Sequence, residues 1–435
     1  MAISVLDGTI VNVALPSIAR DFHSGEAASV WVINAYQVTI LMLLLPLASL
    51  GEIVGYRRVS EAGVAVFTLA SIACAFAPSL LALSIARVVQ GIGAAGIMSC
   101  NAALLRFTYP HRQLGRAIGI NAFVVATSFA IGPTLASAVL AVAHWRWLFG
   151  INVPLGLVTL AIGLRAWPDA GRARHALNLV GSLLYAGAFG LALSGLQSLS
   201  HSDAGALALA EIALALVLWV LLLRHERGRS APLIPVDLLA RPVFALSVLT
   251  GVCSFTAQMS ALVALPFEIQ RLGHSAVETG LFITPWPVAL AITAPIAGRL
   301  ADRYPAGLLG GLGLMIFAAG LLALALFPSA GSAAGWVWRM ALCGLGFGLF
   351  QSPNNRALMA SAPRARSGAA GGMLSTARLA GQTLGAASVA ILFRLAGAAG
   401  SHLALYFAAA LAMLGSLVSL GRLRHASPQI EEQRP

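Results

Sequence analysis

Residues 307–327 read GLLGGLGLMIFAAGLLALALF, a run of 21 residues with no charged side chain. A helix of this length is about 30 Å long, which matches the hydrocarbon core of a bilayer. The whole chain is similar, because 59% of its 435 residues are hydrophobic and 10% are charged, whereas soluble domains carry about 25% charged residues. The composition excludes an ordinary soluble enzyme, a nucleic-acid-binding module and a disordered chain, and predicts a multi-spanning membrane protein.

Fourteen apolar runs of about 20 residues follow one another along the chain. Lipid cannot satisfy an unpaired backbone amide, so each run is expected to form a helix and the fold class is an all-α membrane protein. The runs fall near residues 1–20, 30–51, 60–78, 79–105, 117–141, 148–165, 179–198, 204–222, 242–266, 277–297, 307–327, 334–353, 368–394 and 402–420.

Arginine supplies all 27 basic residues and predicts the orientation of the chain. If the N-terminus lies inside, twenty arginines fall on inner segments and five on outer ones, while Arg87 and Arg378 lie within spans. Cytoplasmic loops carry an excess of basic residues. We therefore expect a multi-pass protein of the bacterial inner membrane with both termini in the cytoplasm. The arginines form no stripe with aromatic residues, so no nucleic-acid partner is expected.

The first run differs from the others because Pro16 follows only fifteen residues. Fifteen residues form a helix of about 22 Å, which is shorter than the hydrocarbon core of about 30 Å. We expect either a segment upstream of Met1 or a truncated first helix, and we favour the upstream segment.

Two stretches of the first half repeat in the second half. ASLGEIVGYRR (48–58) matches GRLADRYP (298–305) at an offset of 250 residues when Glu52 is aligned with Asp302. RVVQGIGAAG (87–96) matches RMALCGLGFG (339–348) at an offset of 253 when Gly91 is aligned with Gly344. Repeated halves around a central site are typical of secondary transporters, while duplication of a packing unit alone is the alternative interpretation.

The repeat predicts two pseudo-symmetric six-helix bundles separated by a two-helix insert. Polar stretches on either side of the seventh and eighth runs mark the insert. The predicted boundaries are 1–166 for the N-terminal half, 167–235 for the insert with its flanking loops, 236–421 for the C-terminal half and 422–435 for a cytoplasmic tail.

An ordered set of motifs covers almost the whole chain. The set comprises LDGTIVNVALP (6–16), the stretch 48–58, ARVVQGIGAAG (86–96), IGP (131–133), HWRWLFGINVPLG (144–156), GLGFGLFQSPNNRALM (344–359) and TARLAGQTLGAA (376–387). It resembles the major facilitator superfamily and, with fourteen spans, is similar to the drug:proton antiporters of that family. The resemblance implies two six-helix bundles that rock around a central cavity, and proton-driven export of amphipathic drugs, often lipophilic cations.

Four positions depart from the family's pattern. Ala48 and Glu52 stand where the inner-loop motif normally has Gly and Asp, and Ala136 and Ser137 stand where the fifth-span motif normally has Gly. Because Glu keeps the charge and Ala and Ser remain small, we expect the function to survive these changes.

Proton coupling is assigned to Asp7 and Arg87. An ionised carboxylate inside a span costs roughly 2.5–3.5 kcal/mol on insertion scales, and such residues tend to mark proton paths. The alternative for Asp7 is an idle, solvated acid near the start of the chain. Arg87 cannot deprotonate, so it would act by pairing with a carboxylate. The resemblance assigns it to coupling, and the alternative is an arginine that reaches the outer surface.

Two short inner stretches are assigned to gating. Their mixed charges would latch the two bundles together at the cytoplasmic face, or would act only as topology anchors. The assigned gating residues are Glu52, Gly55, Arg57, Arg58, Gly298, Asp302 and Arg303.

Gly132 and Pro133 are expected to interrupt the hydrogen bonds of the fifth span and allow a bend. The resemblance associates this motif with antiporters, and a structural kink without a functional role is the alternative. Glu268 and Glu278 flank an outer loop and are expected to be solvated.

Trp286 lies between Pro285 and Pro287, which are expected to interrupt the tenth span near the membrane centre, where transporter sites lie. An indole face there would bind an organic cation, whereas core packing is the alternative. Arg378 is expected to face the same cavity. The residues assigned to the substrate cavity are Asn12, Gln90, Trp286, Arg378 and Gln382.

These observations favour a proton-coupled exporter of amphipathic compounds that works by alternating access, with small amphipathic substrates, protons and the bilayer as its partners. No metal-ligating or nucleophilic motif is found, so we expect no enzyme activity and no cofactor beyond the proton gradient. The alternatives are an exporter of a dedicated metabolite, siderophore or antibiotic, an importer, and a transport-inactive membrane sensor. A periplasmic adaptor is left open as a further partner.

Overall fold

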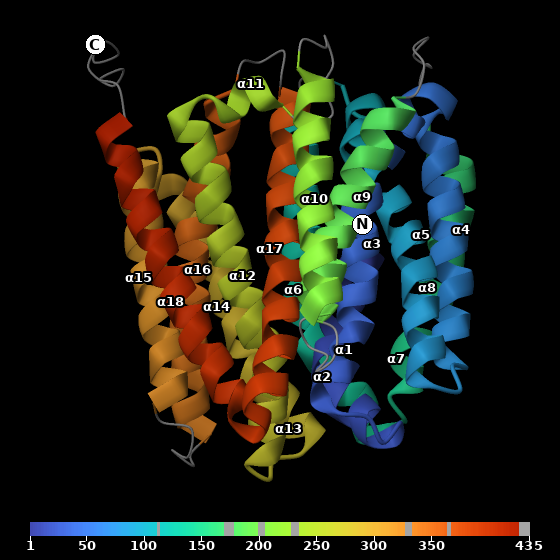
Figure 1. Cartoon of the computed structure of the whole chain (residues 1–435), viewed down its shortest axis with the longest axis vertical. Helices are drawn as coiled ribbons and strands as arrows, with labels where there is room; N and C mark the ends of the chain where they lie inside the picture. Colours follow the sequence, from blue (N-terminus) through green and yellow to red (C-terminus); the bar gives the residue numbers. More distant parts are fainter. Residues whose placement is uncertain are drawn as a thin grey trace.

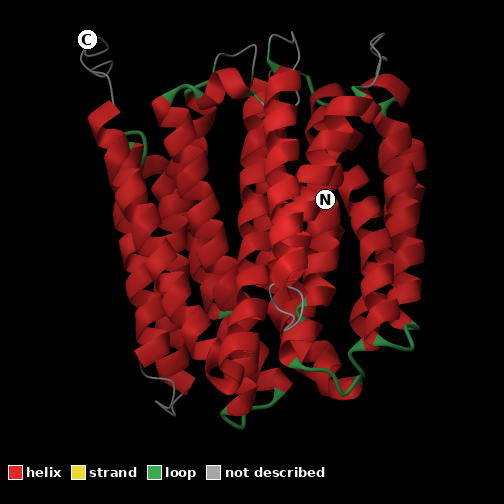
Figure 2. Ribbon diagram, in the orientation of Figure 1, coloured by secondary structure: helices red, strands yellow, loops and turns green. Residues whose placement is uncertain are grey.

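The computed structural model describes residues 1–110, 114–168, 178–198, 205–227, 235–326, 333–362 and 367–425. Every regular element in these residues is a helix (Figure 2). The helices are α1 (Ala2–Asp21), α2 (Glu26–Ser29), α3 (Trp31–Val54), α4 (Tyr56–Ala75), α5 (Leu80–Thr108), α6 (Leu114–Val142), α7 (Arg146–Gly150), α8 (Asn152–Ala166), α9 (Leu179–Ser198), α10 (Gly205–Glu226), α11 (Val236–Leu239), α12 (Pro242–Arg271), α13 (Ala276–Ile283), α14 (Pro285–Leu300), α15 (Ala306–Leu326), α16 (Ala333–Ala360), α17 (Ser367–Ala396) and α18 (Gly400–Gly421).

Thirteen helical stretches of the described chain are long and apolar enough to cross a membrane. Three of them join consecutive helices across a short break, namely α2 with α3, α7 with α8, and α13 with α14. The remaining long helix, α6, has 29 residues and is apolar over residues 127–142. In order, these helices correspond to the fourteen expected spans.

The expected interruption of the tenth span is confirmed. Helix α13 ends at Ile283 and α14 begins at Pro285, so Thr284 alone separates them. A proline at the first position of a helix lacks only an N–H that has no partner inside the helix.

The first helix agrees with the run expected over residues 1–20 and is not shortened at Pro16. Pro16 lies inside α1, which continues to Asp21 and has 20 residues. At 1.5 Å per residue this helix is about 30 Å long. Figure 1 shows residue 1 part way along the bundle.

The predicted inner loop 48–58 is almost entirely helical, which corrects the sequence interpretation. Residues up to Val54 belong to α3, α4 begins at Tyr56, and Gly55 is the only residue between them. Gly55 has a φ of 110°, a conformation that glycine adopts without the steric cost of a Cβ atom. Glu52 therefore lies on the last turn of a helix.

The two halves use the same pairs of helices. In the N-terminal half α4 packs on α5 and α8, α3 packs on α5, and α1 packs on α6. In the C-terminal half the equivalent pairs are α15 with α16 and α18, α14 with α16, and α12 with α17. The halves meet where α6 packs on α13 and α14, and where α17 packs on α3. Helices α9 and α10 pack on each other, and α9 contacts both α3 and α17.

Equivalent glycines allow close helix crossings in both halves. A Cβ atom on Gly63 of α4 would lie 2.8 Å from the carbonyl oxygen of Gly93 of α5. A Cβ atom on Gly313 of α15 would lie 2.7 Å from the carbonyl oxygen of Gly346 of α16. Such backbone contacts are possible only with small residues at the crossing.

The connections between helices identify the two ends of the bundle, which we call the basic end, after its arginines, and the far end. The basic end, at the top of Figure 1, carries the α3–α4 and α14–α15 connections and the last turn of α18. The far end carries the α1–α2 and α12–α13 connections.

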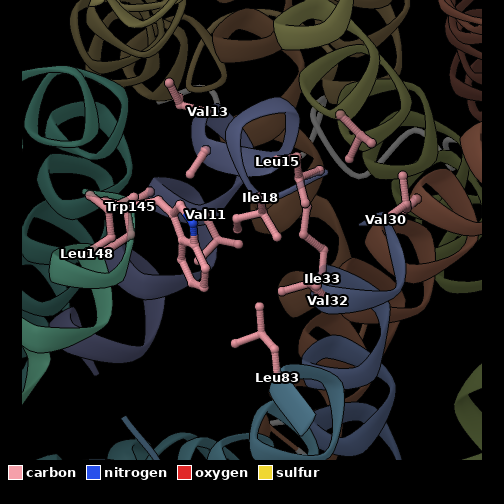
Figure 3. Packing of buried hydrophobic residues seen from close by; sticks show 14 of the residues in the cluster. Val11, Val13, Leu15, Ile18, Val30, Val32, Ile33, Leu83, Trp145 and Leu148 are labelled. Carbon is pink, nitrogen blue, oxygen red and sulfur yellow. The ribbon is translucent and has the colours of Figure 1, made fainter. Parts of the chain in front are cut away.

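A hydrophobic cluster shared by the two halves lies toward the far end, and we call it the far-end core. It contains Val11, Leu15 and Ile18 of α1, shown in Figure 3 with Trp145, together with side chains of α12 and α17 from the other half. Its α12 and α17 members are Met259, Val263, Ala264, Phe267, Ala386, Val389, Ala390 and Phe393. The far-end core closes the seam between the halves at this level.

The glycine crossings generate a stability prediction. Gly313→Ala places a methyl group against backbone atoms of α16, and overpacking of this kind typically costs about 1–3 kcal/mol. We expect a lower unfolding temperature for the purified variant in detergent, measured by circular dichroism at 222 nm. Gly371→Ala is the matched control, because a Cβ atom there meets nothing within 4 Å. Equal unfolding temperatures for the two variants would contradict this account of the crossing.

Candidate functional site

Asp7 and Arg87 form a buried ion pair between α1 and α5. Both side chains are 0% exposed, and Arg87 Nη1 donates to Asp7 Oδ2. The two residues are 80 positions apart in the chain, and they meet because α1 crosses the far-end part of α5. The structure thus excludes the alternative in which Arg87 reaches the outer surface.

The second carboxylate oxygen of Asp7 is also occupied. Asp7 Oδ1 accepts hydrogen bonds from Asn152 Nδ2 at 2.6 Å and from Gln90 Nε2 at 3.2 Å. Gln90 Nε2 also donates to Ser71 Oγ at 2.8 Å. Four helices, α1, α4, α5 and α8, therefore contribute side chains to one buried polar cluster.

Arg87 makes further contacts on every side. Its Nη1 donates to Gln90 Oε1 at 2.6 Å and its Nε donates to the carbonyl oxygen of Val32 at 3.1 Å. Its guanidinium carbon lies 4.0 Å from the ring centroid of Tyr36, in a cation–π contact. Among the described residues Nη2 has no partner. The cluster holds the cation firmly while leaving one donor unused.

The cluster contains residues that the sequence interpretation missed. Asn152 lies at the start of α8 in the motif 144–156, and Tyr36 and Ser71 lie on α3 and α4. Their polar character within apolar runs was the available signal, because membrane-embedded polar groups tend to find partners. Gln90, which was assigned to the substrate cavity, belongs to this cluster instead.

The gating residues lie at the basic end, and the contacts described for them stay within each half. Arg57 donates from Nε to Glu61 at 2.7 Å and from Nη2 to the carbonyl oxygen of Leu164 at 2.6 Å. Asp302 forms an ion pair with Arg356 of α16. A latch between the halves is not visible in these contacts and stays a prediction.

The remaining gating residues are placed as follows. Arg58 and Arg303 are exposed, and Glu52 is half-buried. A Cβ atom on Gly298 of α14 would lie 3.2 Å from Ser352 Oγ of α16, so this position brings two helices of the C-terminal half close together.

Gly132 and Pro133 lie inside α6 at its contact with α1. A Cβ atom on Gly132 would collide with the side chain of Thr9, so this glycine allows α1 and α6 to approach closely. Helix α6 continues through Pro133. One residue further on, Thr134 Oγ1 lies 2.8 Å from Thr284 Oγ1 of the other half. The motif therefore sits where the two halves meet.

Asn12 and Trp286 lie in different surroundings. A small cavity between the halves is lined by Thr9 and Asn12 on one side and by Leu262 and Pro287 on the other. Trp286 is 0% exposed and packs edge-on against Phe317 in the interior of the C-terminal half. The structure thus does not bring Trp286 to this cavity, and the core-packing alternative describes its position.

The prediction that Glu268 is solvated is wrong, whereas that for Glu278 is confirmed. Glu268 is 2% exposed, accepts from Arg271 and Ser401, and has His402 Nε2 at 3.0 Å. Glu278 is about half exposed and caps α13 through Ser275. Glu268 lies on the last turns of α12, beside the start of α18. The sequence around Glu268 does not predict that these two helix ends lie together.

A hydrogen bond between the halves lies at the far end. Arg20 Nη2 donates to Gln270 Oε1 at 2.9 Å, which joins the end of α1 to the end of α12. Together with the far-end core, this contact closes the far side of the seam.

Matched six-helix halves with a buried ion pair in one of them define a multi-pass membrane transporter. The profile of the Major Facilitator Superfamily matches residues 1–386, and the chain belongs to this family. It is 49% identical over 422 residues to the Escherichia coli (strain K12) protein named "Uncharacterized transporter YebQ", covering 96% of this chain and 92% of YebQ. It is 34% identical to the Mycobacterium tuberculosis multidrug resistance protein Stp, covering 87% of this chain and 71% of Stp.

The likeness extends to solved structures. A crystal structure of the peptide transporter POT in complex with alafosfalin superposes with a TM-score of 0.72, over 98% of this chain and 92% of that chain, at 14% sequence identity. At this identity the likeness concerns the fold.

The ion pair generates a prediction about stability. Asp7→Asn or Arg87→Gln alone leaves one buried charge without its partner, which typically costs about 3–5 kcal/mol. The double variant removes both charges, so we expect its loss to be clearly smaller than the sum of the single losses. The unfolding temperatures of the four proteins in detergent measure this coupling. Additive losses would mean that the two side chains do not interact energetically.

Proposed function

We propose that this chain is a proton-coupled exporter of amphipathic drugs or other toxic compounds, within the fourteen-span drug:proton antiporter branch. The observation that carries the proposal is the Asp7–Arg87 ion pair, which is enclosed by α1, α4, α5 and α8. A carboxylate held this deeply in a membrane protein is suited to take up and release protons. The similarity to the multidrug resistance protein Stp supports drugs as the substrate class.

Protonation of Asp7 would change the forces on α1. A neutral carboxyl group binds Arg87 more weakly than a carboxylate does, and its proton would compete with the donors of Gln90 and Asn152. Helix α1 also supplies Ile10, Leu15 and Ile18 of the far-end core. Since one stiff helix carries both groups, a change at Asp7 would shift the equilibrium between open and closed arrangements of the far-end seam.

The direction of transport follows from this coupling. We place the basic end in the cytoplasm of a bacterium, with the chain in the inner membrane, because cytoplasmic segments are rich in arginine. Protons entering from the far end would then reach Asp7 when the far-end seam opens, and the substrate would leave by the same side. The proton gradient would be the only energy source.

An exporter of one metabolite, siderophore or antibiotic would use the same coupling, and it is the second candidate. A panel of chemically different substrates separates the two. One tightly bound compound indicates the dedicated exporter, whereas many weakly bound compounds indicate multidrug export.

The test of coupling is Asp7→Asn. We expect this variant to insert in the membrane and to lose proton-dependent efflux by at least tenfold, measured with ethidium or tetramethylrhodamine, whichever dye the unmodified chain exports. Efflux is measured in cells at equal expression, and substrate-induced proton movement is measured in everted vesicles with acridine orange. The Asp7→Asn/Arg87→Gln double variant gives a second test in which no unpaired charge is left. Asp7→Glu keeps a carboxylate and is expected to retain part of the activity.

Asp21→Asn is the matched control, because Asp21 lies on the same helix and is partly exposed. It is expected to preserve proton-dependent efflux. Unchanged efflux in Asp7→Asn, with the protein folded by gel filtration, would remove Asp7 from the mechanism.

A further inference from the structure

Asp7 offers little attraction to a cationic substrate in this structure. Asp7 is the acidic residue assigned to the first span, and both of its oxygens are already bound by Arg87, Asn152 and Gln90. Its side chain is 0% exposed. A cation entering between the halves would therefore find this carboxylate neutralised and out of reach.

Arg378 lies on the face of α17 that is directed toward the seam between the halves. Residues at i, i+4, i+8 and i+11 share one face of a helix, so Arg378 is aligned with Gln382, Ala386 and Val389. Ala386 and Val389 are buried in the far-end core, which also contains Ile10 of α1. Arg378 and Gln382 are thus on the same stripe, one to three turns nearer the basic end than the far-end core.

The other faces of α17 are occupied by protein. Gly381 and Gly385 pack against Phe255 and Met259 of α12. Leu379 packs in a cluster with side chains of α3. Arg378 and Gln382 lie between these two contacts, on the face of α17 whose Ala386 and Val389 share the far-end core with α1.

Arg378 is a partly buried cation without a counter-charge in the described chain. No hydrogen bond or ion pair joins it to another described residue, and its Nε is enclosed without a partner. Arg422, by contrast, donates to Asn354 at 2.8 Å and to Ser247 at 2.9 Å. An enclosed charge without partners is costly, and a bound anion would supply the missing partner.

Guanidinium groups recognise carboxylate and phosphate geometry with paired hydrogen bonds. The amide of Gln382, one turn away, can add a further donor. We propose that Arg378, supported by Gln382, is a specificity-determining residue that binds the anionic group of an amphipathic substrate, such as a carboxylate, sulfonate or ionised phenol. This inference rests on the proposed export function and narrows its amphipathic substrates to anionic or zwitterionic compounds, in place of the lipophilic cations that the family resemblance implies.

Charged thiol reagents measure the potential at this position without requiring transport. The probe is Gln382→Cys, modified by the anionic reagent MTSES and the cationic reagent MTSET in the purified full chain. We expect MTSES to be favoured, and the ratio of the two rates to fall at least tenfold when Arg378→Gln is added, because a unit charge within one helical turn dominates the local potential. Arg378→Lys should keep most of the ratio. The unmodified chain, whose four cysteines are buried, gives the background.

The substrate class is tested by protection of the same cysteine. Tetramethylrhodamine and its methyl ester differ only in a free carboxylate. We expect the free acid to protect Gln382→Cys at a concentration at least tenfold lower than the ester, and Arg378→Gln to abolish this difference.

Three results would overturn the assignment. They are a cysteine at 382 that neither reagent modifies, a rate ratio that does not depend on Arg378, and protection by the ester that equals or exceeds protection by the acid. None of them bears on Asp7, so proton coupling would stand. Conversely, proton-independent efflux would overturn the proposed function while the labelling result stood.

Discussion

Arg87 and Asp7 lie out of reach of water, so the charge of each has to be compensated by the other. The arrangement of the N-terminal half follows from this constraint. The charges of Arg87 and Asp7 are stable in the interior only because α4, α5 and α8 provide donors and acceptors around them. Replacing such a pair by apolar residues is often neutral or stabilising in soluble proteins. Its presence here is therefore better explained by function than by stability.

The pair also links two levels of the molecule. Asp7 lies on the same helix as the side chains that close the far-end seam, and Arg87 contacts Tyr36 and Val32 of α3. Helix α3 in turn packs on α17 of the other half. Protonation of one carboxylate would thus act directly on two of the surfaces that join the halves, namely the far-end core and the contact of α3 with α17.

The helices were predictable from the sequence because lipid permits few alternatives. Apolar length, arginine bias and the repeat were enough to predict the spans and their order, and Pro285 marked a real break. The error in the stretch 48–58 arose where packing overrides a local signal, because this stretch is helical apart from Gly55.

The site was only partly predictable for a related reason. Asp7 and Arg87 stood out as charges within apolar runs, but their pairing depends on which helices cross. The burial of Glu268 beside Ser401, and of Trp286 among phenylalanines, likewise depends on contacts over more than a hundred residues or between neighbouring helices. Periodicity identifies a helix and its polar positions, but it does not state what each position faces.

Within the spans, the repeat preserves the close helix contacts but not the charged residues. Gly132 faces Thr9 as Gly385 faces Met259, so the position equivalent to Asp7 is Ala257, which is apolar and buried.

Arg87 corresponds in the same way to Met340, which is also buried, and Arg378 corresponds to Val125. The ionisable pair and the unpaired cation therefore belong to opposite members of one duplicated scaffold. If the proton binds at Asp7 and the substrate binds at Arg378, as proposed, the two do not compete for one binding site. Proton binding and substrate binding then exclude each other only because they favour different arrangements of the two bundles.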